Sequence, residues 1–263
     1  MKKFVMVFAV AVLSIFIFVG MAKASSMFGV ADPNAKAGNF QLGVGYFFNN
    51  FDWKGSDVSK FGIQQNQAYA EGAYTLMPGT EIYARLGGAD LKTKDVDFFG
   101  ATPNYSDGMK VYTGIGIRGT IYKFNPQFSI GANLYGDYVW QNYKDSSAGS
   151  FMGFNGSSTS EVKNMWTVNL LVAAQFSPNK FATIYIGPKF YYGQFTGDIT
   201  AGDYSHGRFS SVSQSGTFHP NTWIGGVVGI NFVAPSISDK INFGVETSYS
   251  DEWSIGGKIS YRF

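Results

Sequence analysis

The last eleven residues, Trp253-Ser-Ile-Gly-Gly-Lys-Ile-Ser-Tyr-Arg-Phe263, alternate between two kinds of side chain. One parity carries the apolar residues Trp253, Ile255, Ile259, Tyr261 and Phe263, and the other carries only serine, glycine, lysine and arginine. Successive side chains of a β-strand point to opposite faces, so the segment predicts a strand with one apolar and one polar face. We expect the apolar face to meet lipid.

The same alternation occurs in nine further segments. In residues 38–49 the apolar face carries Phe40, Leu42, Val44, Tyr46 and Phe48. The others lie near 65–76, 80–89, 109–121, 127–140, 164–176, 181–194, 221–232 and 240–249, and the tail at 253–263 completes the set. The sequence therefore predicts an all-β chain of ten strands, with eight as the alternative.

The connections alternate between short and long. Four short links each contain a proline, and long polar loops are predicted at 50–63, 90–108, 141–163 and 195–220, with a short exception at 250–252. This pattern is typical of a transmembrane antiparallel up-and-down β-barrel. A soluble barrel or sandwich also alternates, but its polar parity is a solvated surface. Here that parity is rich in glycine, asparagine and serine, and aromatic residues near the strand ends predict two girdles around an apolar band.

The first 24 residues have the features of a cleaved signal peptide. Two lysines precede an apolar run over residues 4–19, and the small residues Ala22 and Ala24 form a cleavage site. We therefore expect a signal peptide at 1–24 and one barrel domain at 25–263. An uncleaved anchor helix is the alternative, but it needs about 20 apolar residues and no cleavage site.

Charge and cysteine content exclude several classes of protein. Without the three lysines of residues 1–24, 17 basic residues stand against 18 acidic ones, so net charge gives no reason to expect a nucleic-acid partner. The chain has no cysteine, which excludes a disulfide framework and a lipidated cysteine. No stretch after Ala24 approaches the length of a transmembrane helix.

The signal peptide and the tail ending in Tyr261 and Phe263 resemble those of small bacterial outer-membrane β-barrels of the outer membrane protein A kind. The resemblance implies that the terminal aromatic residues are an assembly signal. It also implies periplasmic termini and extracellular long loops. Implied partners are outer-membrane lipid and lipopolysaccharide, the barrel-assembly machinery during biogenesis, and a surface partner that the sequence does not identify. The chain departs from the family by having ten strands instead of eight and no periplasmic domain.

The sequence predicts no catalytic, cofactor or metal site. In its number of strands the chain resembles the omptin proteases. That resemblance implies two catalytic pairs: a pair of aspartates, and a histidine with an aspartate two positions away from it. Neither His206 nor His219 has an aspartate two residues away. The pair Asp95 and Asp97 lies in a predicted loop tip. Ser205 and Ser210 near His206 are more simply interpreted as loop residues than as acyl-transfer nucleophiles. A metal site of Asp203 with the two histidines has no recognisable ligand spacing, so these three are also interpreted as loop residues.

Charged residues on the polar parity are predicted to lie in the lumen, because lipid-facing charges would cost about 2–4 kcal/mol near the membrane midplane. They are Glu71, Arg85, Lys110, Arg118, Asp137, Lys189, Glu246, Lys258 and Arg262. The link Met77-Pro78-Gly79 sets a register that predicts Glu71 opposite Arg85. Either the charges and inward tyrosines plug the lumen, or they line a thin water channel. We favour a largely blocked lumen.

These features predict a non-enzymatic outer-membrane barrel whose surface loops act in adhesion, surface interaction or envelope integrity. A narrow, mildly anion-favouring channel is the second interpretation. An omptin-like or acyl-transfer enzyme is the third.

Overall fold

The computed structural model describes residues 29–31, 35–55, 60–94, 106–151, 154–205, 208–233, 235, 237–250 and 252–263. The expected signal peptide lies outside these residues. The described strands are β1 (Phe40–Gly55), β2 (Phe61–Met77), β3 (Thr80–Lys94), β4 (Ser106–Lys123), β5 (Phe128–Val139), β6 (Tyr143–Phe151), β7 (Phe154–Asn179), β8 (Ala182–Ser205), β9 (Arg208–Pro220), β10 (Ile224–Val233), β11 (Ile241–Tyr249) and β12 (Trp253–Arg262).

Ten of these strands close into an antiparallel barrel. The order around it is β1-β2-β3-β4-β5-β7-β8-β10-β11-β12, and β12 returns to pair with β1 from Gln41↔Arg262 to Phe48↔Ile255. Closure leaves no unpaired edge around the wall, which is the condition for a sheet to lie in lipid. The structure thus confirms the predicted all-β barrel of ten strands. Within the described residues there is no helix long and apolar enough to cross a membrane.

Tight turns gather at one end of the barrel, which we call the short-turn end. Gly79 takes φ = 74° in the β2–β3 turn, a conformation that glycine adopts without steric cost. Asn179 closes the β7–β8 turn by accepting hydrogen bonds from the amides of Phe181 and Ala182 at 2.8 and 3.1 Å. Asn125 serves the β4–β5 turn in the same way.

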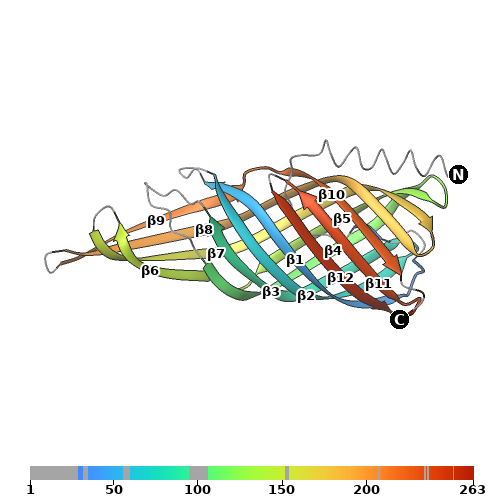
Figure 1. Cartoon of the computed structure of the whole chain (residues 1–263), viewed down its shortest axis with the longest axis horizontal. Coiled ribbons are helices and arrows are strands. Elements are labelled where there is room, and N and C mark those ends of the chain that lie inside the picture. Colours follow the sequence, from blue (N-terminus) through green and yellow to red (C-terminus); the bar gives the residue numbers. More distant parts are fainter. Residues whose placement is uncertain are drawn as a thin grey trace.

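The opposite end, which we call the extended end, differs from the prediction of long loops. Residues 141–163 and 195–220 are largely strand: β6 pairs with the first half of β7, and β9 pairs with the second half of β8. These halves of β7 and β8 also pair with each other, from Gly156↔Asp203 to Lys163↔Thr196. Strands β6 to β9 therefore form a sheet that projects past the barrel wall (Figure 1), which we call the extension. Residues 50–55 and 61–63 of the predicted first loop are also strand.

The outer wall is apolar and ends in aromatic residues. Leu42, Val44 and Ile115 are 48%, 57% and 71% exposed although they lie within paired strands. Aromatic pairs lie toward the extended end, such as Tyr249 with Trp253, and toward the short-turn end, such as Phe128 with Phe176. An exposed apolar band between aromatic belts fits a barrel that faces lipid.

Candidate functional site

The half of the lumen nearest the extended end is filled by apolar side chains. This aromatic layer consists of Phe47, Phe51, Trp53, Phe61, Ile63, Tyr69, Ala89, Leu91, Tyr112, Val139, Tyr143, Val162, Met165, Phe195 and Phe218. Trp53 is fully buried, and its ring centroid lies 4.7 Å from that of Phe195. Several of these residues fall in segments that the sequence predicts as loops, so the aromatic layer was not predicted. Their inward parity in the longer strands was the available indication.

Tyrosine rings fill the rest of the lumen by packing against glycines of the neighbouring strand. A Cβ atom added to Gly45 would lie closer than 3.0 Å to the ring of Tyr69, and one added to Gly229 would meet Tyr185 in the same way. Gly114 and Gly116 receive the rings of two further inward tyrosines. Inward glycine is therefore required at these positions by the close approach of a ring.

An ion-pair network crosses the lumen toward the short-turn end. The register places Glu71 opposite Arg85, as predicted, and Arg85 Nε donates to Glu71 Oε2 at 2.9 Å. Glu71 Oε1 also accepts from Arg118 Nη2 at 3.3 Å and from Lys258 Nζ at 3.0 Å. The side chains of Glu71 and Arg85 are 2% and 1% exposed. One buried carboxylate therefore joins strands β2, β3, β4 and β12.

Glu81 is a member of this network that the sequence analysis missed. Arg118 Nε donates to Glu81 Oε2 at 2.8 Å, and Glu81 is 4% exposed. Its odd position in β3, shared with Arg85, would have identified it. Arg85 is also held by rings: its guanidinium carbon lies 4.5 and 4.7 Å from the ring centroids of Tyr69 and Tyr135. Such cation–π contacts are strongest where water is excluded.

Part of the N-terminal segment lies inside the lumen. Asn133 Nδ2 donates to the Gly29 carbonyl at 2.6 Å, and the Gly29 amide donates to Glu246 Oε2 at 2.9 Å. Val30 and Ala31 are 3% and 1% exposed. An eight-stranded barrel is just wide enough for side chains to fill. The wider ten-stranded barrel accommodates these residues as well, which no periodic pattern in the sequence indicated.

The other predicted lumen charges lie in different surroundings. Glu246 is fully buried and also accepts from Tyr185 Oη at 2.9 Å. Asp137 accepts from Thr167 Oγ1 at 2.9 Å. Lys189 is fully buried, and its Nζ has no hydrogen-bond partner among the described residues. Lys110 stands apart from the network and pairs with Asp107 at 3.0 Å.

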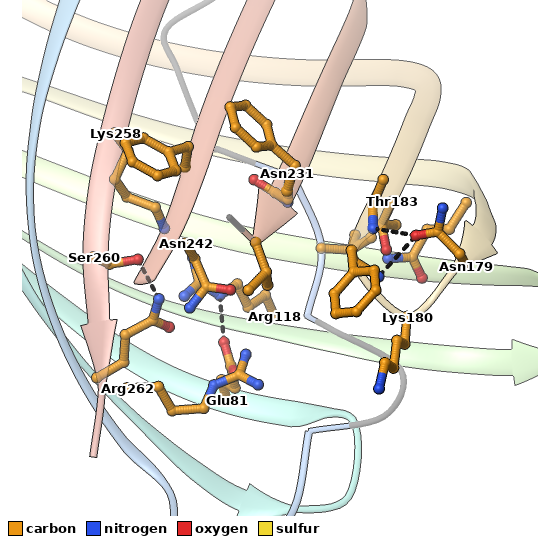
Figure 2. A pocket seen from close by; sticks show the side chains of 18 residues that line it. Glu81, Arg118, Asn179, Lys180, Thr183, Asn231, Asn242, Lys258, Ser260 and Arg262 are labelled. Carbon is orange, nitrogen blue, oxygen red and sulfur yellow. Dashed lines mark hydrogen bonds and ion pairs between the residues drawn. The ribbon is translucent and has the colours of Figure 1, made fainter. Parts of the chain in front are cut away.

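Arg262 reaches a pocket at the short-turn end of the lumen, which we call the mouth pocket. Its lining includes Arg118, Lys180, Asn231 and Lys258 (Figure 2). Val30 of the N-terminal segment also lines it, as do Arg118 and Lys258, which reach inward to Glu71. The mouth pocket is therefore a polar recess open at one end of a filled barrel.

Few of the residues that were considered for an enzyme or a metal site lie close together in the described part of the chain. The His219 ring stacks on Tyr192, and its Nδ1 lies 3.3 Å from Tyr192 Oη and from the Gly193 carbonyl oxygen. Asp95, Asp97 and His206 lie outside the described residues. Among the described residues no group of three or more histidine, cysteine, aspartate or glutamate side chains could hold a metal ion.

The terminal residue lies at the seam that closes the barrel. The Phe263 amide donates to the Phe40 carbonyl at 2.9 Å, and the two ring centroids are 5.9 Å apart. The Tyr261 ring lies 4.9 Å from that of Phe263. The predicted assembly residues therefore extend the β1–β12 pairing by one position.

A scan against protein-family models and a search of the curated proteins both find no match to the sequence. Among solved structures, the chain is similar to the outer membrane protein OprG from Pseudomonas aeruginosa, with 10% identity over 88% of this chain and 98% of that one and a TM-score of 0.44. It is also similar to the outer membrane protease OmpT from Escherichia coli, with 13% identity, coverage of 86% and 96%, and a TM-score of 0.43. Ail, the attachment invasion locus protein of Yersinia pestis, matches with 12% identity, coverage of 87% and 100%, and a TM-score of 0.28. Likeness at this level carries no information about activity.

Proposed function

We propose that this protein is a non-enzymatic outer-membrane barrel that acts at the cell surface through its extension. The observation that carries the proposal is the filled lumen. The aromatic layer occupies the half nearest the extended end, and the ion-pair network with residues 29–31 occupies the other. A barrel whose lumen is filled in both halves would act through the surface that it exposes outside the membrane, and not by passing solutes.

The extension is suited to contact with a hydrated surface. Residues 154–161, Phe-Asn-Gly-Ser-Ser-Thr-Ser-Glu, and 208–217, Arg-Phe-Ser-Ser-Val-Ser-Gln-Ser-Gly-Thr, are rich in hydroxyl groups. Cross-strand contacts hold it together: Lys163 pairs with Asp198 at 2.7 Å, and the hydroxyls of Thr200 and Ser213 are 3.2 Å apart. A polar sheet of this kind supports roles in adhesion, surface interaction or envelope integrity.

The proposal includes an orientation, with the short-turn end in the periplasm and the extension outside the cell. Ser213 lies on the extension and Asn179 in a tight turn, and both are exposed. Because the chain has no cysteine, Ser213→Cys and Asn179→Cys can be labelled without background. On intact cells a membrane-impermeant thiol reagent should label only the first variant. Labelling of the second alone would invert the orientation.

The function is tested by shortening the extension while keeping the barrel. Ser146 pairs with Thr159, and Thr200 pairs with Ser213, so residues 147–158 and 201–212 can each be replaced by an Asn-Gly turn. Cells with the shortened protein should lose attachment to host cells or matrix, or become sensitive to antibiotics that the outer membrane excludes. Heat-modifiable migration on gels checks that the variant still folds. Full retention of both properties by a folded variant would contradict the proposal.

A narrow channel is the second candidate, favoured by polar atoms that need a solvating partner. Lys189 Nζ and Asp137 Oδ2 are buried in the lumen and have no hydrogen-bond partner among the described residues. Water threading the lumen would satisfy both. Single-channel recording in planar bilayers decides between the candidates, because the filled lumen predicts no conductance above the bare membrane. Steady anion-favouring conductance would instead support the channel.

A further inference from the structure

The mouth pocket combines a positive charge surplus with a fixed donor. Four cationic side chains line it, Arg118, Lys180, Lys258 and Arg262, whereas Glu81 is the single carboxylate in the lining. Figure 2 shows these side chains around the recess, drawn from several strands. A recess with low-dielectric walls and an excess of one sign of charge concentrates ions of the opposite sign.

Arg118 is the most firmly held cation in the pocket lining. Its Nε and Nη2 atoms are held by Glu81 and Glu71 at 2.8 and 3.3 Å, which fixes the plane of the guanidinium. The third nitrogen, Nη1, is buried, as is the whole residue at 3% exposure, and it has no hydrogen-bond partner among the described residues. A buried donor without a partner is costly unless a ligand or water satisfies it.

Further donors stand around the same recess. Asn231 and Asn242 contribute side-chain amides, and Ser260 contributes a hydroxyl that the Gln41 amide contacts. Guanidinium groups bind planar or tetrahedral oxyanions through paired N–H donors, while lysine supplies a point charge. Val30, which is 3% exposed, also belongs to the lining.

We propose that the mouth pocket is a binding site for an oxyanion of the phosphate class. Two sources share this chemistry: a soluble phosphate compound, and the headgroup phosphate of an anionic phospholipid. The second is possible because Phe232 and Phe243 also line the pocket, stack at 5.2 Å and lie at the lipid-facing rim. The site is independent of whether the barrel conducts. It rests on the proposed orientation only for placing its ligand in the periplasm or the inner leaflet.

Two peripheral variants test the site without removing the network that holds the barrel together. Arg262→Gln and Lys180→Gln each remove one lining charge, whereas Arg118→Gln would also break the pairs with Glu71 and Glu81. Lys123→Gln is the matched control, because Lys123 is an exposed cation at the same end of the barrel but outside the lining. Heat-modifiable migration confirms folding of each variant.

Isothermal titration of the full mature barrel in a zwitterionic detergent with pyrophosphate, at constant ionic strength, measures the soluble arm. Native mass spectrometry after incorporation into phosphatidylglycerol nanodiscs measures the lipid arm. Saturable one-to-one binding in either arm, weakened at least tenfold by Arg262→Gln and Lys180→Gln together and unchanged by Lys123→Gln, supports the site and identifies its source. Absence of binding in both arms overturns it. Equal weakening by Lys123→Gln also overturns it, because that result means general charge attraction.

Discussion

The buried carboxylate of Glu71 gives the sharpest test of a filled lumen. It accepts hydrogen bonds from Arg85, Arg118 and Lys258 within 3.3 Å, and its side chain is 2% exposed. Replacing it with glutamine leaves three cations around a neutral amide. Removing one partner of a buried ion pair costs about 3–5 kcal/mol, and we expect Glu71→Gln to lower the free energy of unfolding by that amount.

A second substitution separates the pair from the network. Arg85→Met in the Glu71→Gln background removes one of the three cations that Glu71 contacts. If the three contacts share the loss equally, the coupling between positions 71 and 85 should be about 1–2 kcal/mol. Arg85→Met alone should also lose cation–π contacts with Tyr69 and Tyr135, worth about 0.5–2 kcal/mol.

Urea unfolding of the barrel in lipid vesicles, followed by tryptophan fluorescence, measures all four corners of this cycle. Glu161→Gln is the control, because Glu161 pairs with Lys144 and Lys163 on the extension and exposed pairs contribute about 0–1 kcal/mol. Zero coupling, together with a change of ion selectivity in planar bilayers, would refute the filled lumen. In that case water in an open channel would solvate the Glu71 carboxylate and the Arg85 guanidinium separately.

Three other perturbations follow from the packing, the seam and the extension. Gly229→Ala should lower the free energy of unfolding by about 1–3 kcal/mol in the same assay, because the added Cβ would overlap a tyrosine ring of β8. Gly72→Ala is the control and should have little effect, because the nearest atom to its added Cβ would be 3.8 Å away. Equal effects of the two substitutions would contradict the packing. Deleting Phe263 should slow folding and insertion, seen as less of the heat-modifiable form, and insertion at the normal rate would contradict its role at the seam. Hydrogen bonds from Lys163 and Ser215 hold the pKa of Asp198 below its usual value, so the charged form stabilises the extension above that value and this contribution is lost as pH falls through the lower folded pKa. Hydrogen exchange should show the extension opening in that acid range, and Asp198→Asn should reduce the pH dependence, the rest of which comes from Glu161, whose pKa is also lowered by Lys163.

Alternation of side chains was sufficient to predict the barrel, because one face of each strand meets lipid and the other meets the lumen. The same parity, with a tight turn at Pro78-Gly79, predicted Glu71 opposite Arg85. Next to the turn the ladder is irregular: Met77 pairs with Thr80, and the register shifts between Thr75 and Met77. Register within a hairpin is therefore readable from parity and turn length together.

Two features could not be predicted, for different physical reasons. The sequence of the extension is polar at both parities, as in residues 155–161 and 213–217, so it shows no alternation and resembles a loop. The aromatic layer reverses the usual pattern, since Phe47, Phe51 and Trp53 are apolar yet point inward. In β1 the apolar parity changes from even positions up to Phe48 to odd positions from Phe51 onward, and this break in the alternation resembles the end of a strand.

The unusual content of glycine and tyrosine follows from the width of the barrel. Ten strands enclose more space than inward side chains of ordinary size fill, and a tyrosine ring reaches the centre only where the neighbouring strand offers a glycine. Tyr185 illustrates the result: it lies over Gly229, donates to Glu246, and packs against Gly29 of the N-terminal segment. Residues 29–31 thus occupy space that the tyrosines leave, and they are held by hydrogen bonds from Asn133 and Gln175. Because this segment belongs to no strand of the barrel, it fills the lumen without contributing to the wall, whereas the aromatic layer in the other half is built from the strands themselves.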